Sequence, residues 1–214
     1  MSAQTTTRRR RSRPKAVLLD LGGIVIDIDP HACFASWARA ADVNAGVIAA
    51  RWAVDDAYKA FETGAIDFDE YVANLAARLG IVLTREQWRS GWNALLRAPF
   101  EGVARILPEV ASVMPLYGFS NTNTVHQEAW QSRFVVELAP FQKIYTSWEI
   151  GLRKPAVEAY LKVADAMAIA PPDILFIDDN RENVLGARSA GLDARHVTDP
   201  DDTVAILRDV VARS

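Results

Sequence analysis

Near the start of the chain lies the feature that most constrains its fold, an apolar run that ends in an acidic residue and two glycines. Residues 15–23 read Lys-Ala-Val-Leu-Leu-Asp-Leu-Gly-Gly, directly after Pro14. This run predicts a strand buried on both faces, and the glycines predict a flexible turn behind it. Open α/β sheets place their chemistry at the carboxyl ends of such strands. Asp20 therefore either caps a turn or belongs to a site, depending on which groups follow the later strands.

Length and composition limit the chain to one ordinary core and a small appended subdomain. It has 214 residues, of which 50% are hydrophobic. No apolar run is long enough to span a bilayer, and the N-terminal segment has the charges of a signal peptide without its apolar segment. Cys33 is the single cysteine, so we expect no internal disulfide and no cysteine-built metal site. These features predict a cytoplasmic protein with no membrane partner.

Positive charge is concentrated at the N-terminus. Residues 1–15 hold six of the 24 basic residues and no acidic residue, which leaves 18 basic against 27 acidic residues in the rest of the chain. The basic stretch from Arg8 to Arg13 has two interpretations: an arm that binds nucleic acid or another polyanion, or a solvated, disordered tail. The acidic body favours the second, because it would repel the same polyanion. We therefore expect a disordered basic tail over 1–14 and no nucleic-acid partner.

A segment with helical periodicity follows the first strand. Asp29 and Pro30 predict the start of a helix with Asp29 as its N-cap, and Thr84 and Gln87 have the spacing of a capping box. Apolar residues recur every three to four positions in four groups: Phe34, Trp37 and Ala38; Trp52, Ala57, Tyr58 and Phe61; Phe68, Tyr71, Leu75 and Leu79; Trp88, Trp92 and Leu95. We interpret 29–97 as an all-helical cap inserted over the carboxyl end of the first strand.

Strands and helices alternate from Phe100 to the C-terminus. Apolar runs predict strands over 114–119, 144–147, 174–177 and 194–197, and periodic stretches predict helices over 103–113, 126–134, 156–167, 181–190 and 202–212. This alternation indicates a parallel sheet with right-handed crossovers. The predicted fold is α/β, a Rossmann-like parallel sheet with helices on both faces, and its core domain comprises 15–28 and 98–214.

Polar clusters that could cooperate with Asp20 follow the later strands. Ser120 to Asn123 can present hydroxyl, amide and backbone donors to an anion. Lys154 stands just before a predicted helix, where its charge can meet a phosphate and restrain a carboxylate. Asp178 and Asp179 follow a buried strand, and adjacent carboxylates there call for a divalent cation. Each cluster has a structural explanation of its own, but their joint occurrence at strand ends favours a site.

These motifs, in this order and with helices inserted after the first, resemble the haloacid dehalogenase superfamily. The resemblance runs from about Lys15 to the C-terminus and is carried by Asp20-Leu21-Gly22-Gly23, Ser120-Asn121, Lys154-Pro155 and Asp178-Asp179-x-x-x-Asn183-x-x-Gly186-Ala187. Within the superfamily, residues 20–29, 120–126 and 151–155 are most similar to the small bacterial sugar phosphatases that include the α-D-glucose-1-phosphate phosphatase.

The resemblance implies a Mg²⁺-dependent phosphatase that acts on a small phosphorylated metabolite, such as glucose 1-phosphate, through an aspartyl-phosphate intermediate. Asp20 is then the nucleophile, and Lys154 offsets the negative charge of Asp20 and the phosphate. Ser120 and the Asn121 amide bind the non-bridging phosphate oxygens. The implied Mg²⁺ ligands are the Asp20 carboxylate, the Gly22 backbone carbonyl and Asp179, with Asp178 in support directly or through water.

The sequence departs from the family pattern at Gly22. Many phosphatases of this superfamily have a second Asp there, which protonates the leaving group and then activates water, help that is typically worth roughly a hundred- to ten-thousand-fold. His126 and Asp27 are candidate substitutes that the sequence does not rank, and His126 equally fits a packing role against the cap. We hypothesise a preference for phosphates whose leaving group needs little protonation, such as an anomeric sugar phosphate, an aryl phosphate or an acyl phosphate.

Two other functions are compatible with the same residues. A dehalogenase would use an Asp nucleophile to displace halide from carbon without a metal, and the adjacent Asp178 and Asp179 argue against it. A catalytically weak binding or regulatory protein would keep the site and turn over slowly for want of a carboxylate at Gly22.

Overall fold

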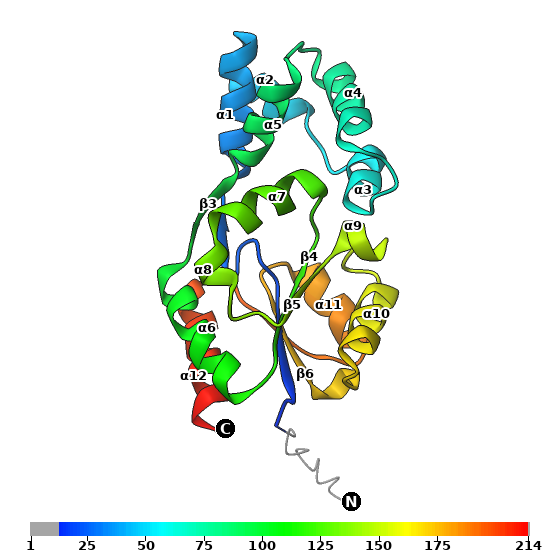
Figure 1. Ribbon diagram of the computed structural model, residues 1–214. Helices are drawn as coiled ribbons and strands as arrows, with labels where there is room; N and C mark the ends of the chain where they lie inside the picture. The colour runs from blue at the N-terminus through cyan, green and yellow to red at the C-terminus, as the bar shows by residue number, and fades with distance from the viewer. Residues whose placement is uncertain (1–12, 214) are drawn as a thin grey trace, which may run out of the picture.

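A five-stranded parallel sheet forms the centre of the computed structural model, which describes residues 13–213 (Figure 1). The strand order is β5 (Lys143–Thr146), β4 (Leu116–Ser120), β1 (Ala16–Leu19), β6 (Ile174–Asp178) and β7 (Asp193–His196). β1 is the middle strand and runs parallel to both of its neighbours. The predicted α/β fold is confirmed, whereas the expected basic tail over 1–14 falls almost wholly outside the described residues.

The register of the sheet brings the predicted polar clusters to one edge. Leu19 of β1 pairs with Gly118 of β4 and with Ile177 of β6. Parallel strands end at the same edge of a sheet, so the residues that follow these three partners emerge side by side. Asp20, Ser120 and Asp178 lie at this edge because each follows, by one or two positions, the residue of its own strand in this row of three.

Alternate side chains of β1 pack into two cores. Val17 and Leu19 belong to the core on the side of α6 (Glu101–Val113) and α12 (Pro200–Ala212), whereas Ala16 and Leu18 belong to the core on the side of α10 (Val157–Met167) and α11 (Arg181–Ser189). Figure 1 shows these two helical layers on opposite sides of the sheet. All four side chains are at most 1% exposed. If β1 shifted its pairing register by one residue, each of these side chains would move to the wrong core. The packing therefore fixes the register of β1 and with it the position of Asp20.

Five helices lie above the carboxyl edge of the sheet and share a hydrophobic cluster of their own (Figure 1). They are α1 (Pro30–Ala41), α2 (Ala45–Arg51), α3 (Asp56–Glu62), α4 (Phe68–Leu79) and α5 (Arg85–Asn93), which we call the helical cap. Trp37 is fully buried and contacts the rings of Trp88 and Trp92. Gly91 permits this packing, because a Cβ there would lie 2.3 Å from atoms of the Trp37 ring.

The helix starts follow the capping signals in the sequence. Asp29 accepts a hydrogen bond from the His31 N–H at 3.0 Å at the start of α1, and Thr84 and Gln87 form the predicted capping box of α5. α2 was not predicted, because Ile48 is its single buried residue and no apolar stripe marks it. The boundaries of the cap at 29 and 97 stay a prediction.

A two-stranded antiparallel ribbon joins the cap to the core. It consists of β2 (Ile26–Ile28) and β3 (Leu96–Pro99). The Asp29 N–H donates to the Leu95 carbonyl at 2.8 Å, and the Phe100 N–H donates to the Val25 carbonyl at 2.9 Å. β3 was not predicted from the sequence, because its pairing partner lies far away in the chain and Leu95 continues the apolar period of α5.

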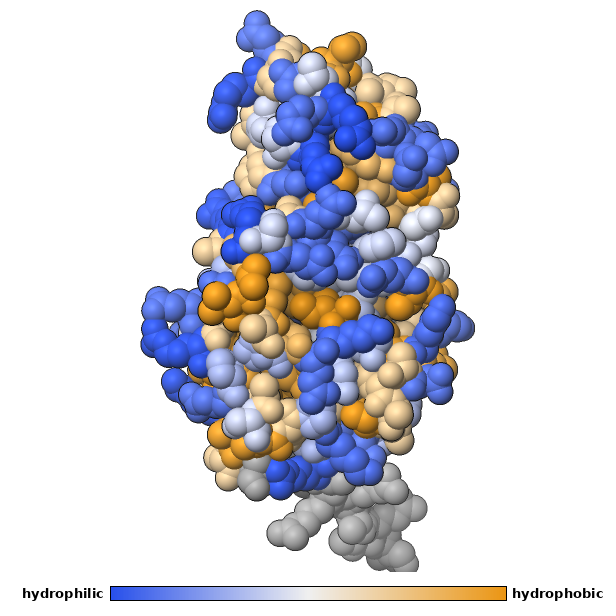
Figure 2. All heavy atoms as spheres, viewed as in Figure 1, coloured by the Kyte–Doolittle hydropathy of each residue, from blue (hydrophilic) through white to orange (hydrophobic). Residues whose placement is uncertain are grey.

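The remaining helices lie in the connections: α7 (Thr124–Arg133), α8 (Val135–Leu138), α9 (Ser147–Ile150) and the 3₁₀ turn η1 (Pro171–Asp173). On the face seen in Figure 2, hydrophobic residues gather across the middle of the molecule, at the level of α8, where Val135 and Val136 are exposed. Over residues 13–213, no helix has both the length and the apolar character that a membrane span requires.

Candidate active site

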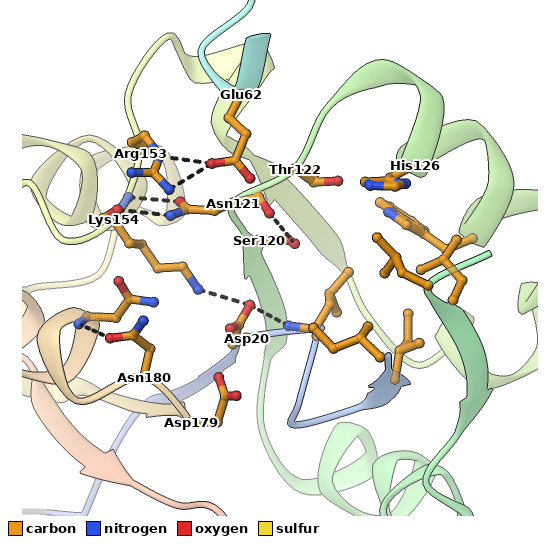
Figure 3. A pocket seen from close by; sticks show the side chains of 18 of the residues that line it. Asp20, Glu62, Ser120, Asn121, Thr122, His126, Arg153, Lys154, Asp179 and Asn180 are labelled. Carbon is orange, nitrogen blue, oxygen red and sulfur yellow. Dashed lines mark hydrogen bonds and ion pairs between the residues drawn. The ribbon is translucent and has the colours of Figure 1, made fainter. Parts of the chain in front are cut away.

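A cavity of about 310 Å³ lies between the carboxyl edge of the sheet and the helical cap (Figure 3). Cavities of this size hold small ligands. Most of the predicted site residues line it, namely Asp20, Gly22, Ser120, Asn121, His126, Lys154 and Asp179. Asp178 is fully buried and lies within ion-pair distance of Lys154. The structure therefore brings the predicted site residues together at one place.

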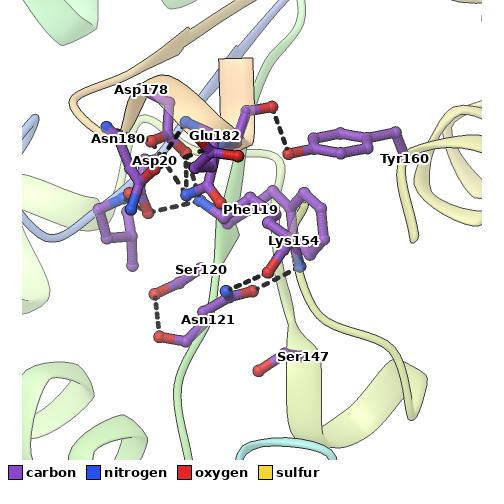
Figure 4. A network of polar contacts seen from close by, with 12 residues as sticks. Asp20, Phe119, Ser120, Asn121, Ser147, Lys154, Tyr160, Asp178, Asn180 and Glu182 are labelled. Atoms are coloured by element: carbon purple, nitrogen blue, oxygen red, sulfur yellow. Dashed lines mark hydrogen bonds and ion pairs between the residues drawn. The ribbon is translucent and has the colours of Figure 1, made fainter. Parts of the chain in front are cut away.

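Lys154 bridges two of the aspartates (Figure 4). Its side chain is fully buried, and its Nζ lies 2.7 Å from Asp178 Oδ2 and 2.9 Å from Asp20 Oδ1. The same Nζ donates to the Phe119 carbonyl at 2.9 Å. Burial alone would lower the pKa of Lys154, but Asp178 and Asp20 raise it above its usual value. The lysine is therefore charged at neutral pH and holds Asp20 in one orientation.

Both carboxylate oxygens of Asp178 accept hydrogen bonds. Besides Lys154, it accepts hydrogen bonds from the Asn180 N–H at 2.8 Å and from Asn183 Nδ2 at 3.1 Å. These donors come from the start of α11, so Asp178 fixes that helix against Lys154. This geometry favours a supporting role for Asp178 over direct contact with a metal.

Asp179 lies against the glycine turn that follows β1. Gly23 has a φ of +80°, and a Cβ there would lie 2.3 Å from Asp179 Oδ2. A glycine is needed for the left-handed backbone and again for the close approach of the carboxylate. The turn therefore brings Asp179 to the loop that carries Asp20 and Gly22.

Asp20, Asp178 and Asp179 form a carboxylate cluster in which one oxygen of each lies within 4.8 Å of the others. Burial raises the pKa of Asp20 to about 8, a shift that Lys154 opposes and the two neighbouring aspartates reinforce. Burial and the charge of Asp178 also raise the pKa of Asp179. Lys154 alone therefore does not supply the positive charge that would keep all three carboxylates ionised at neutral pH.

The donor set of this cluster fits Mg²⁺. Carboxylate and carbonyl oxygens are its preferred protein ligands. The Gly22 carbonyl accepts no backbone hydrogen bond from the residues that the structure describes, so its oxygen is available beside Asp20. A divalent cation held by Asp20, Gly22 and Asp179 would supply the missing positive charge.

The loop after β4 combines a hydroxyl group with a structural clamp. Ser120 is buried at the end of β4 and lines the cavity. Asn121 Nδ2 donates to the Lys154 carbonyl at 2.9 Å, and Asn121 Oδ1 accepts from the Lys154 N–H at 2.8 Å. The Asn121 side chain therefore fixes the backbone of Lys154, and the Ser120 hydroxyl makes only a long hydrogen bond, 3.5 Å, to the Asn121 carbonyl.

Gly22 has an apolar neighbour on the side where a side chain would project. A Cβ at Gly22 would lie 3.1 Å from Ile28 Cδ1, and Ile28 lines the cavity. Asp27, one of the two proposed substitutes for the missing acid, does not line the cavity, and its Oδ2 lies 4.0 Å from Arg97 Nη1. Ile28 therefore takes the space beside the nucleophile that an acidic residue at 22 would need.

His126 lines the cavity as an uncharged ring. It stacks on Trp92 of α5, with ring centroids 4.9 Å apart, and its Nδ1 lies 3.0 Å from Asn93 Oδ1. Burial lowers the pKa of His126 to about 3. A neutral imidazole at pH 7 cannot give up a proton as imidazolium does, so these contacts support packing against the cap rather than acid catalysis.

Three polar residues on the cap side of the cavity were not predicted from the sequence: Tyr58 and Glu62 of α3, and Arg153. Arg153 stands beside Lys154 in the motif, but its position there gives no sign of a role. Glu62 follows Tyr58 by one helical turn, so it shares the face of α3 that the apolar pattern had assigned to packing. Its partner Arg153 is 91 residues away in the chain, and no local pattern marks such a pair.

Comparison with known proteins agrees with this arrangement. A family model for haloacid dehalogenase-like hydrolases matches residues 14–191. The chain is 23% identical over 184 residues to D-ribitol-5-phosphate phosphatase from Bacteroides thetaiotaomicron. The alignment covers 84% of this chain and 89% of the relative.

Two solved structures share the fold. One is a haloacid dehalogenase-family enzyme from Bacteroides thetaiotaomicron in complex with magnesium and inorganic phosphate, with a TM-score of 0.75, 24% identity and coverage of 86% of this chain and 93% of that chain. The other is L-2-haloacid dehalogenase from Xanthobacter autotrophicus with chloropropionic acid covalently bound, with a TM-score of 0.66, 20% identity and coverage of 86% and 77%. At these identities the likeness establishes the fold alone.

Proposed function

The chain belongs to the haloacid dehalogenase-like hydrolase family, and we propose that within it this protein is a Mg²⁺-dependent phosphatase of small phosphorylated metabolites. The observation that carries the proposal is the cluster of Asp20, Asp178 and Asp179 with a single lysine. A cluster with this excess of negative charge suits a reaction that brings a divalent cation and a phosphate to the nucleophile.

The reaction has two displacements at phosphorus. A carboxylate oxygen of Asp20 attacks the phosphorus atom, and the bond to the leaving oxygen breaks as the new bond forms. Water then attacks the phosphorus of the aspartyl-phosphate, which releases inorganic phosphate and restores the Asp20 carboxylate. Lys154 carries the positive charge nearest to Asp20, and the Ser120 hydroxyl and the Asn121 backbone N–H donate to the phosphate oxygens.

Mg²⁺ would be held by Asp20, the Gly22 carbonyl and Asp179, with Asp178 behind them. When bound, it supplies positive charge that lets an anionic nucleophile approach an anionic substrate. Asp178 contributes by orienting Lys154 and the start of α11, through the hydrogen bonds it accepts from Lys154, Asn180 and Asn183.

The protonation that a leaving group requires limits the class of phosphate esters that the site can hydrolyse. Gly22 offers no acid, Ile28 adjoins its position, and burial keeps the pKa of His126 low. We therefore expect substrates whose leaving group needs little protonation, and among metabolites an anomeric sugar phosphate such as glucose 1-phosphate meets this requirement. D-ribitol-5-phosphate phosphatase, the relative described above, acts on a different phosphate, so glucose 1-phosphate is a proposal that must be tested directly.

The dehalogenase interpretation is disfavoured by the same cluster. Displacement of halide from carbon needs one aspartate and no cation, so it gives no reason for Asp179 to stand beside Asp20 at a cost in electrostatic repulsion. The likeness to a dehalogenase structure concerns the fold and does not bear on this choice.

The test is phosphate release from a panel of phosphorylated metabolites, with Mg²⁺ and with excess chelator, for the wild type and for Asp20→Asn. We expect metal-dependent release that falls by at least a thousandfold in the variant, because the amide is not a nucleophile, while the circular dichroism spectrum is retained. Activity that survives the chelator but is lost with Asp20 would contradict the metal assignment. Trapped phosphoenzyme without steady turnover would point instead to the regulatory interpretation.

A further inference from the structure

We propose that Glu62 and Arg153 form a neutral, hydrogen-bonding pair that binds hydroxyl groups of the leaving group and so selects sugar phosphates. This inference rests on the proposed phosphatase function and names the side chains that bind the part of the substrate away from the phosphate.

The pair joins the cap to the core inside the cavity (Figure 3). Glu62 is the last residue of α3 and is 3% exposed, and its Oε2 accepts from Arg153 Nε at 2.9 Å and lies 2.7 Å from Arg153 Nη2. Both residues line the cavity. Two contacts from one guanidinium to one carboxylate oxygen hold the pair in a defined geometry.

The core fixes one partner and the cap fixes the other. Arg153 directly precedes Lys154, whose backbone is clamped by the Asn121 side chain at 2.8 and 2.9 Å. Glu62 is held by α3, and the Tyr58 hydroxyl one turn earlier also interacts with its carboxylate. The positions of both charges are therefore set before a substrate enters.

The pair lies on the side from which the leaving group departs. In Figure 3, Asp20 lies at the sheet end of the cavity, with Glu62 and Arg153 on the cap side. Phosphoryl transfer keeps the attacking and leaving oxygens roughly in line. When Asp20 attacks from the sheet, the leaving group therefore points toward the cap, where Glu62 and Arg153 lie.

The chemistry of the pair suits neutral polyhydroxyl groups. A carboxylate accepts from hydroxyl groups, and the remaining guanidinium N–H groups donate to hydroxyl oxygens. Because Glu62 already neutralises Arg153, the pair offers no net positive charge to a second phosphate or a carboxylate. The ribbon and the residue before it supply a contrasting apolar wall of Ile26, Ile28, Leu95 and Leu96, on which the carbon face of a sugar can lie.

The experiment compares two substrates in the wild type, Glu62→Gln, and the double variant Glu62→Gln with Arg153→Gln. The substrates are the best sugar phosphate of the metabolite panel and p-nitrophenyl phosphate, whose aryl group carries no further hydroxyl group. The double variant leaves no buried charge unpaired, so it guards against loss of folding. A matched control is Glu128→Gln, which removes the exposed Arg89–Glu128 ion pair between α5 and α7, another cap–core contact that does not line the cavity.

We expect Glu62→Gln and the double variant to lower the ratio of kcat/KM for the sugar phosphate over p-nitrophenyl phosphate by about tenfold to a hundredfold, mainly through KM, because a hydrogen bond to a charged group is lost. Glu128→Gln should leave the ratio unchanged.

An equal loss on both substrates would overturn the proposal, since the pair would then only hold the cap in place. So would a wild type that hydrolyses p-nitrophenyl phosphate but no sugar phosphate. Absence of all Mg²⁺-dependent hydrolysis would instead overturn the proposed phosphatase function, and this inference with it.

Discussion

Gly22 and Gly23 follow the same aspartate but have different reasons to be glycine. Gly23 has a left-handed backbone, and a Cβ there would collide with Asp179 at 2.3 Å. Gly22 has no such backbone, and the nearest obstacle to a side chain is the end of Ile28 at 3.1 Å. A side chain at 23 would disrupt the loop, whereas one at 22 needs only the movement of a flexible, partly exposed side chain.

This difference predicts that an acid can be built at position 22. We expect Gly22→Asp combined with Ile28→Ala to raise kcat for an alkyl phosphate such as glycerol 3-phosphate by about tenfold or more relative to p-nitrophenyl phosphate, because the alkoxide leaving group gains a proton donor. Gly22→Asp alone should give a smaller gain, since Ile28 must move aside. Steady-state kinetics on both substrates measure the effect, and Ile28→Ala alone is the control. An unchanged ratio in the double variant would show that protonation does not limit the reaction.

At the scale of helices and strands, the cap and the core each contain a helical glycine with a different surrounding. Gly91 in α5 faces the buried Trp37 ring at 2.3 Å, whereas Gly102 in α6 faces Val204 at an ordinary contact distance of 3.4 Å. Trp37 is fully buried in the cap cluster and cannot retreat. Substitution by alanine at these two positions should therefore change the free energy of unfolding in different ways.

We expect Gly91→Ala to lower the free energy of unfolding by about 1 to 3 kcal/mol through overpacking. Gly102→Ala should leave it unchanged or raise it by up to about 1 kcal/mol, because alanine favours the helix. Urea denaturation followed by circular dichroism measures both. Equal effects of the two substitutions would contradict the close packing of α1 against α5.

The elements that the sequence predicted are those with a local signal. β1, β4 and β6 carry apolar runs, and the polar residues that follow them meet because parallel strands end at one edge. α5 was marked at its start by Thr84 and Gln87. β3 and the contact between Glu62 and Arg153 had no such signal, since each depends on a partner brought close only by the folded chain. The space taken by Ile28 beside Gly22 is likewise a property of packing, which spacing in the sequence does not encode.

Across the whole molecule, the carboxylate cluster couples metal binding to stability. Asp20 comes from the loop after β1, Asp178 and Asp179 from the end of β6, and their mutual repulsion opposes folding when no cation is bound. A ligand that binds the folded chain alone stabilises it by about 2.7 kcal/mol at a hundred times its dissociation constant.

We therefore expect saturating Mg²⁺ to raise the melting temperature by about 5 to 10 °C for a chain of this size. Asp179→Asn should remove this response and also raise the melting temperature of the metal-free protein, because the variant loses a negative charge that burial and Asp178 already disfavour. Differential scanning calorimetry with Mg²⁺ and with chelator measures both effects. A Mg²⁺ response retained in Asp179→Asn would exclude this residue as a ligand.

The ribbon of β2 and β3 determines how such a chain can diversify. The Asp29 N–H donates to the Leu95 carbonyl, and Ile26 pairs with Pro99, so the chain leaves the core and returns to it at neighbouring points. In its connection to the core, the whole helical segment therefore resembles the loop of a β-hairpin, and loops tolerate replacement. A lineage could exchange everything between Asp29 and Leu95, Glu62 included, without moving Asp20, Asp178 or Asp179. The core, which carries the reaction chemistry, and the cap, which shapes the substrate range, can therefore evolve separately.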